Sequence, residues 1–216
     1  MAAKKRKVAR RRKPPETQEE RRARILAAAC REFGGRGFAA ASTNAIADDA
    51  GVAKGLLFHH FGSKEALFSA AFDSVVERTV SRIFDESSPL PTDLFERLAA
   101  ISLRKLEFFR EEPDAYRLVW TAVMELPEPF RQEILGKQQG RMGAHWARVL
   151  EGVDASRLRP GLSLSAAVET ISLLLAGCER LAIQTLSAPD GRDASLPALQ
   201  DVALMHLGRL RDGLYR

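Results

Sequence analysis

A chain of 216 residues, 45% hydrophobic and 28% charged, can bury a core as one long helical domain or as a small domain joined to a larger one. Its net charge of +5 is uneven: residues 1–64 hold 15 basic and 6 acidic side chains, whereas residues 65–216 hold 18 and 22. Two distant cysteines exclude a disulfide or zinc framework, and the longest apolar run, 171–178, is too short for a bilayer span of about 20 residues. We therefore expect a reduced cytosolic protein without a secretory signal, whose basic end suits a polyanionic partner.

Residues 1–15 form a basic arm with eight Lys or Arg side chains, no acidic one, and Pro14-Pro15 at its end. Because like charges repel and little here is apolar, the arm is predicted to be disordered in free solution. Three interpretations of its function stay open. It follows the DNA minor groove, it acts as a nuclear-localisation sequence through Lys4–Val8, native or engineered, or it is a solvated tail without function.

The next segment has the pattern of a capped helix. Thr17 and Glu20 have capping-box spacing, so a helix is predicted to begin there. Its apolar face consists of Ile25, Leu26, Ala29 and Phe33. The glycine-rich run 34–37 is predicted to stop this helix; a phosphate loop is disfavoured because the Gly-Lys-Ser/Thr ending and a preceding strand are missing.

Residues 42–64 have the pattern of two short helices joined by a turn. Ser42 or Thr43 can cap the first, and Gly51 can end it in a left-handed conformation. A second helix is predicted over Lys54–Phe61. The second helix of such a helix-turn-helix can lie in the DNA major groove, which admits a helix and displays base-specific donors and acceptors.

The residues behind this pattern run Thr43-x-x-Ile46-Ala47-x-x-Ala50-Gly51-Val52-x-Lys54-Gly55-x-Leu57-Phe58-x-x-Phe61-x-Ser63-Lys64-Glu65-x-Leu67. This series resembles the DNA-binding signature of TetR-family transcriptional regulators. The resemblance implies an all-α fold in which an N-terminal three-helix DNA-binding domain, residues 16–86 with a connecting helix, precedes a C-terminal helical bundle, residues 87–216, for ligand binding and dimerisation. Phe38 resembles the aromatic residue that closes the three-helix core.

The resemblance also implies which residues contact DNA: Thr43, Asn44, Lys54, Gly55, Leu56, Phe58, His59, His60 and Lys64. Asn44 can pair with adenine, Leu56 can meet a thymine methyl group, and Lys64 suits a phosphate. Phe58 stands where the family usually has Tyr, and Leu56 where a small or hydroxylated residue is usual, so the operator sequence cannot be carried over. For the two histidines, ordinary surface polarity remains an alternative, and a metal site is disfavoured because adjacent helical residues point about 100° apart.

The remaining pattern is helical without strand-like alternation. Ser63 is predicted to cap a helix that runs to about Phe84 and buries Leu67, Phe68, Ala71, Phe72 and Val75. After a linker at 87–91, further helices are predicted at 92–111, 114–125, 127–152, 163–187 and 195–215.

Two sets of side chains in these helices are candidates for function. By resemblance, an effector pocket is expected among the middle helices. A packed core without a ligand is the alternative, because it would show the same row of aromatic and thioether side chains. The candidate pocket residues are Phe108, Phe109, Tyr116, Trp120, Met124, His145 and Trp146. The helix at 163–187, apolar nearly all round, is expected to pair with the last helix across a two-fold axis through Ile171, Leu175, Cys178, Leu199, Val202, Leu207 and Leu210.

Together with the resemblance, these features predict a homodimeric transcriptional repressor that binds double-stranded DNA. A small apolar or aromatic effector is expected to release it from a palindromic operator. No cofactor, metal or membrane partner is expected, and the expected location is the bacterial cytoplasm at the nucleoid, or a nucleus only if the basic arm is a localisation signal. An effector-independent regulator or an activator is the alternative. An enzyme is disfavoured because Gly-x-Ser-x-Gly, His-Glu-x-x-His and Walker patterns are absent.

Overall fold

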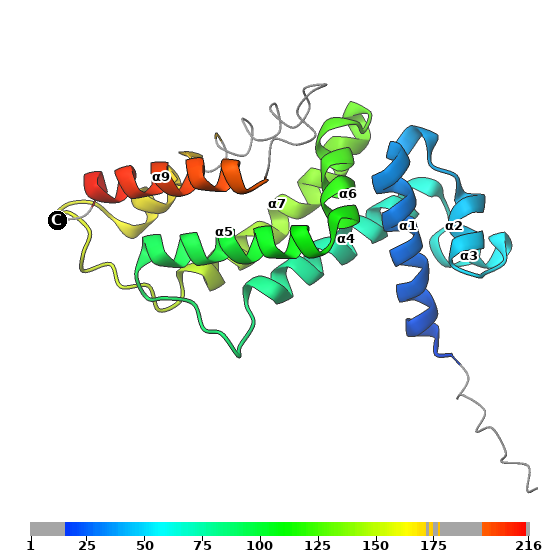
Figure 1. Ribbon diagram of the computed structural model, residues 1–216, viewed down its shortest axis with the longest axis horizontal. Helices are drawn as coiled ribbons and strands as arrows, with labels where there is room; N and C mark the ends of the chain where they lie inside the picture. Colours follow the sequence, from blue (N-terminus) through cyan, green and yellow to red (C-terminus); the bar gives the residue numbers. More distant parts are fainter. Residues whose placement is uncertain (1–15, 172, 175–176, 178–195, 215–216) are drawn as a thin grey trace, which may run out of the picture.

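The computed structural model describes residues 16–171, 173–174, 177 and 196–214, and every regular element within them is a helix. This confirms the predicted all-α fold. One end of the elongated molecule, here called the head, consists of α1 (Gln18–Ala40), α2 (Thr43–Asp49) and α3 (Lys54–Phe61). From the head, α4 (Lys64–Ile83) runs toward a bundle, here called the body, made of α5 (Leu94–Glu111), α6 (Pro113–Met124), α7 (Glu128–Leu150) and α9 (Leu196–Leu214) with the helical residues 164–171 (Figure 1).

The beginning of α1 is held by the capping box that the sequence predicts. The Thr17 hydroxyl accepts from the Glu20 amide at 3.1 Å, and the Glu20 carboxylate accepts from the Thr17 amide at 2.8 Å. The predicted stop at 34–37 is found at the last residue of that run: α1 is helical through Gly34 and breaks at Gly37, where φ is +72°, before a last turn to Ala40. A Cβ on Gly34 would lie 2.8 Å from the Asp114 carbonyl oxygen, so this glycine permits close approach of α1 and α6.

Side-chain caps and a left-handed glycine set the helix-turn-helix, as predicted. Ser42 and Ser63 accept from backbone amides in the first turns of α2 and α4, at 3.4 and 3.1 Å. Gly51 ends the α2 segment with φ of +60°. The bounds of α3 are those predicted from the sequence, Lys54–Phe61.

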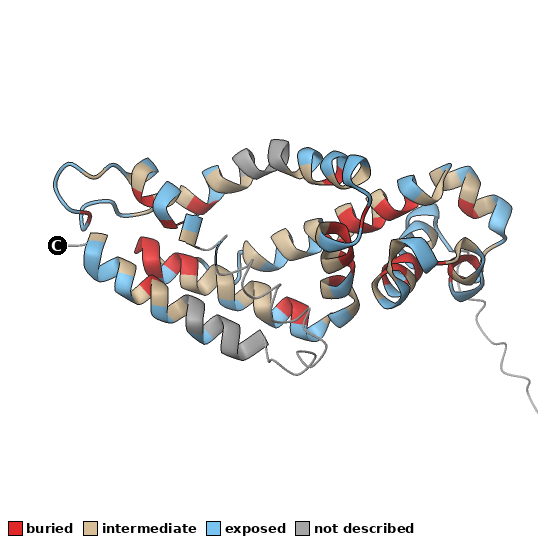
Figure 2. Ribbon diagram, turned by 90° about the horizontal axis from the view of Figure 1, so that it is seen from above, coloured by how far each residue is buried: buried red, intermediate tan, exposed pale blue. Residues whose placement is uncertain are grey.

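An aromatic cluster joins the head to the body. The Phe68 ring of α4 lies 5.0 Å from Phe33, 5.4 Å from Phe38 and 5.8 Å from Phe130, measured between ring centroids. The predicted core positions of α4 are all buried: Leu67, Phe68, Ala71, Phe72 and Val75. Figure 2 shows the buried residues along the inner sides of the head helices and α4. Since Phe33 belongs to α1 and Phe130 to α7, one continuous core fixes α4 between head and body.

A second apolar cluster holds the far end of the body and contains Leu94, Leu98, Val149, Ile171 and Leu207. The predicted helices 92–111, 114–125, 127–152 and 195–215 match α5, α6, α7 and α9 to within three residues at each end. The helix predicted at 163–187 is described only through residues 164–171, 173–174 and 177. Within the described residues, no helix combines the length and the apolar character that crossing a membrane requires.

The Cys30 thiol is expected to react slowly with disulfide reagents. It is 5% exposed on the core face of α1, and burial raises its pKa from 9.0 to about 11. Because the thiolate is the reactive form, the folded Cys30 should react with an aromatic disulfide at pH 8 about 100-fold more slowly than the unfolded chain. The test uses a Cys178→Ser background, so that one thiol is counted, and measures release of the coloured thiol. Equal rates in the folded and denaturant-unfolded states would contradict the burial.

Candidate nucleic-acid interface

The outer face of α3 carries most of the candidate DNA contacts. Leu57 is completely buried and anchors the helix, whereas Lys54, Gly55 and His59 are exposed. Leu56 and Phe58 are half-exposed, and the Lys54 ammonium lies 5.8 Å from the centre of the Phe58 ring. One short helix thus presents a cation, a backbone without a side chain and apolar groups side by side, a mixture that suits phosphates and base edges.

The two flanking helices place the other candidates differently. On α2, Asn44 is exposed and Thr43 is half-buried in the turn after the Ser42 cap. Lys64, at the start of α4, donates from Nζ to the Ala39 carbonyl at 3.1 Å and lies 5.1 Å from the Phe38 ring centre. The Lys64 ammonium therefore also ties α4 to the end of α1, an internal role that its position in the signature did not indicate.

The two histidines of α3 differ in their exposure to solvent. His59 is exposed, but His60 is half-buried, and its Nε2 atom is buried without a hydrogen-bond partner among the described residues. The expectation that both rings face DNA is therefore wrong for this conformation of His60, whose Nε2 would reach a base or phosphate only after the ring turns outward. Within the part of the chain that the structure describes, no group of His, Cys, Asp or Glu is arranged to hold a metal ion.

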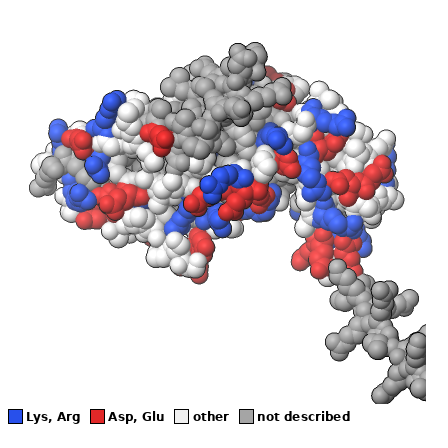
Figure 3. Space-filling model, in the orientation of Figure 1, with Lys and Arg blue, Asp and Glu red and all other residues white. Residues whose placement is uncertain are grey.

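Basic side chains follow α1 along the head, and acidic ones gather where α1 begins (Figure 3). Several of these arginines are ion-paired: Arg21 and Arg24 with Glu16, and Arg31 with Asp49 at 2.9 Å. The basic arm at 1–15 lies outside the described residues. The head therefore carries less uncompensated positive charge on α1 than its count of arginines indicates.

The seven candidate effector residues fall into separate surroundings. Phe108 and Phe109 are buried in the same core as α4, and Phe109 packs against Tyr116 at 5.7 Å. Trp146 packs instead with the second cluster, and Met124 is 44% exposed. Trp120 and His145 are half-buried. Two cavities formed by described residues lie elsewhere, one between α4 and α7 and one between residues 170–174 and α9. The structure does not gather the seven residues around either of these two.

The candidate dimer residues need a correction. Ile171 and Leu207 are 0% and 3% exposed within a single chain, so they fill its own core and offer no surface to a second copy. Leu210 is half-buried beside the same cluster. Leu175 and Cys178 lie outside the described residues, as do the side chains of Leu199 and Val202. A helical pattern of apolar residues did not distinguish the face turned inward from a face left for a partner.

A capped α2, a glycine turn and an outward-facing α3 define the chain as a helix-turn-helix DNA-binding protein. Residues 25–71 match the family model described as bacterial regulatory proteins, tetR family. Over these residues the chain is similar to the DNA-binding domain of TetR-family transcriptional regulators.

Individual relatives agree with this assignment. The chain is 35% identical over 97 residues to the HTH-type transcriptional activator FasR of Mycolicibacterium smegmatis, a match that spans 45% of this chain and only 44% of that relative. It is 29% identical over 143 residues to the HTH-type transcriptional repressor KstR2 of Mycobacterium tuberculosis, covering 65% of this chain and 70% of KstR2. These relatives are regulators and not enzymes.

Solved structures support the fold. A TetR-like transcriptional regulator from Rhodococcus sp. RHA1 has a TM-score of 0.65 at 22% identity, with 92% of this chain and all of that chain covered. A TetR-family regulator from Mesorhizobium loti has a TM-score of 0.68 at 18% identity, over 93% of this chain. At these identities the likeness extends to the arrangement of helices and to nothing finer.

Proposed function

We propose that this regulator is a homodimeric repressor that reads a palindromic operator through α3 and the beginning of α2. The observation that carries the proposal is the two-sided character of α3. Its Leu57 side chain is completely buried, while Lys54, Gly55 and His59 face outward. Residues 1–64 together hold 15 basic and 6 acidic side chains. A helix that is anchored by a buried side chain and exposed on its outer face can enter a major groove without a change in the fold.

Each outward residue then has a specific task. The Lys54 ammonium neutralises a phosphate, and Gly55 lets the backbone approach the duplex closely. Leu56 meets a thymine methyl group, while Asn44 pairs with the exposed edge of an adenine. Phe58 cannot donate a hydrogen bond to a phosphate. We therefore expect the position of α3 in the groove to depend more on the contact between Lys54 and a phosphate.

Lys54→Ala tests the interface. The operator is first obtained by selecting bound duplexes from a random pool. Because Lys54 is assigned to a phosphate, its loss should weaken binding to selected and random duplexes alike. It should also lower the slope of log affinity against log salt by about 0.9 per subunit of the bound dimer. Gel shift at several salt concentrations measures both effects. Lys137→Ala is the matched control, since Lys137 lies on α7 and pairs with Glu133 at 2.7 Å. An unchanged slope for Lys54→Ala would count against the assignment.

Dimerisation and repression rest on separate support. Leu173 and Met205, from the last two described helical segments, are 71% and 45% exposed, so each segment leaves a large apolar side chain that a second copy could cover. The likeness to the repressor KstR2 reaches further along this chain than the likeness to the activator FasR. A two-fold dimer would select duplexes with inverted half-sites. A monomeric mass in solution, or selected duplexes without inverted half-sites, would contradict this part of the proposal.

The release signal is a small apolar or aromatic effector that enters the body. Half-buried Tyr116 and Trp120 on α6, the helix that packs closely against α1, support this position. An effector that favours the released shape must weaken DNA binding by the ratio of its affinities for the two shapes. The packed Phe108 and Phe109 favour the alternative of an effector-independent regulator. A ligand panel read by thermal shift and by operator affinity separates the two, because only the first predicts a ligand that changes both.

A further inference from the structure

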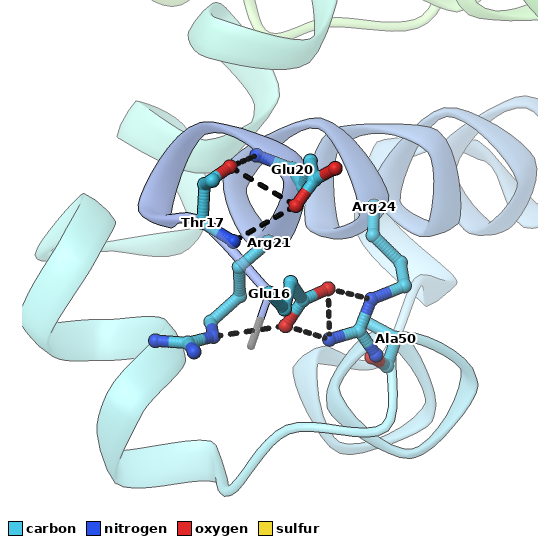
Figure 4. Close-up of polar contacts among 6 residues, drawn as sticks. All are labelled: Glu16, Thr17, Glu20, Arg21, Arg24 and Ala50. Carbon is cyan, nitrogen blue, oxygen red and sulfur yellow. Dashed lines mark hydrogen bonds and ion pairs between the residues drawn. The ribbon is translucent and has the colours of Figure 1, made fainter. Parts of the chain in front are cut away.

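A network of three charged side chains lies where α1 begins (Figure 4). The Glu16 carboxylate accepts from Arg24 at 3.0 Å through Nε and at 2.9 Å through Nη2, and from Arg21 at 3.2 Å. The hydrogen bonds from Arg24, more than those from Arg21, hold the pKa of Glu16 below its ordinary value. One edge of the Arg24 guanidinium is thus held by two hydrogen bonds to the Glu16 carboxylate, which lies just before α1.

The remaining nitrogen of that guanidinium reaches the helix-turn-helix. Arg24 Nη1 donates to the carbonyl oxygen of Ala50, the residue that caps the end of α2. Ala50 is completely buried, and the next residue, Gly51, turns the chain with φ of +60°. A Cβ on Gly51 would lie 3.0 Å from Arg24 Nη1, so the guanidinium is seated directly against the turn. No pattern in the sequence indicated this contact, because an arginine on the polar side of a basic helix is expected to be solvated.

We propose that Arg24 is a positioning residue for DNA recognition, and that Glu16 keeps its guanidinium on the turn and away from the duplex. The turn between Ala50 and Lys54 sets the direction in which α3 leaves α2. A donor fixed to the Ala50 carbonyl restricts that direction, while the two bonds to Glu16 restrict the donor. This inference rests on the proposed reading of DNA by α3, and it adds the residue that orients α3.

The rival explanation is that Arg24 binds a phosphate. Both roles make Arg24 important for affinity. They differ in which duplexes lose affinity when Arg24 is replaced and in whether the salt dependence changes. A phosphate contact serves every sequence and releases a counterion, so its removal weakens all duplexes and flattens the salt dependence. A positioning contact serves only the sequence that α3 reads in one orientation, so its removal weakens the selected duplex alone.

Two variants separate these roles by gel shift on a selected and a random duplex at several salt concentrations. Arg24→Met should weaken binding to the selected duplex about tenfold, as expected for loss of one charge-assisted hydrogen bond, and leave the random duplex and the salt slope unchanged. Glu16→Gln removes the charge that holds Arg24 and Arg21. It should strengthen binding to the random duplex several-fold and steepen the slope by up to about 0.9 per released guanidinium, which also lowers the preference for the selected duplex.

Arg31→Met is the matched control. Arg31 also lies on α1 and bonds to α2, but to the exposed Asp49 carboxylate and not to the turn, so both affinities should stay at the wild-type level. Circular dichroism and a melting curve establish that each variant is folded. If Arg24→Met does not fold, Glu16→Gln, which has nearly the same shape as wild type, still decides the outcome.

Two results would overturn the inference. One is an equal loss of affinity for both duplexes in Arg24→Met, with a salt slope lower by about 0.9 per subunit, which identifies a phosphate contact. The other is that both variants keep the wild-type preference for the selected duplex. A wild-type protein that selects no duplex from the pool is a different result, because it overturns the proposed reading by α3 itself.

Discussion

Replacement of Phe68 by alanine is expected to lower the free energy of unfolding by about 3–5 kcal/mol, the usual cost of removing a buried aromatic ring. Phe68 is completely buried and contacts three other rings, Phe33, Phe38 and Phe130. Those rings come from the end of α1 and the start of α7, so the cavity would open where head and body share their core. Operator affinity should fall as well, because α4 no longer holds the head in one orientation.

Chemical denaturation followed by far-ultraviolet circular dichroism measures this loss. Phe68→Leu is the control, since it keeps most of the volume and should cost less than about 1.5 kcal/mol. A loss below about 1 kcal/mol for Phe68→Ala would mean that the rings around it do not form a shared core. An unchanged operator affinity at full folding would show that the head keeps its orientation without this contact.

The head could be predicted closely because its signals are local. A serine before α2 and another before α4, a glycine after α2 and an apolar period along α4 act over three or four residues. They placed Lys54–Phe61 and the buried face of α4 correctly. The run 34–37 was predicted only as a helix stop, which Gly37 provides, and the separate role of Gly34 was missed. A glycine that ends a helix and a glycine that admits a neighbouring helix look alike in sequence. Only the position of Asp114 across from it distinguishes the two.

The candidate residues of the body could not be predicted in the same way. A period of three to four gives one apolar face, but it does not say whether that face meets its own chain, a ligand or a second copy. Ile171 and Leu207 proved to face their own chain, and Phe108 and Phe109 fill a core. The His60 ring shows the same limit in the head, because the helical pattern of α3 did not indicate that its Nε2 atom is buried.

Arg97 is a buried charged residue of the body, and it makes a contact that no periodicity in the sequence indicates. It is 5% exposed on α5, and its guanidinium donates to the carbonyls of Pro91, Val149 and Glu151. Burial lowers the pKa of Arg97, although an arginine stays protonated at neutral pH. The side chain thereby joins the linker before α5 to the end of α7, where the carbonyls of a helix terminus have no partner within their own helix.

Arg97→Met should therefore cost about 3–5 kcal/mol of unfolding free energy, because the three carbonyls lose a charged donor and methionine replaces only the stem of the side chain. Arg82→Met is the control: Arg82 joins α4 to Glu111 of α5 at 3.1 Å, but both side chains are largely in solvent, so its loss should cost at most about 1 kcal/mol. Denaturant titration of both variants measures the difference, and similar costs would mean that solvent replaces the Arg97 donors. Since Arg97 is remote from α3, folded Arg97→Met should keep its operator affinity, whereas Phe68→Ala should lose it. The pair of variants thus tests whether the stability of the body and the orientation of the head are separate properties of this chain.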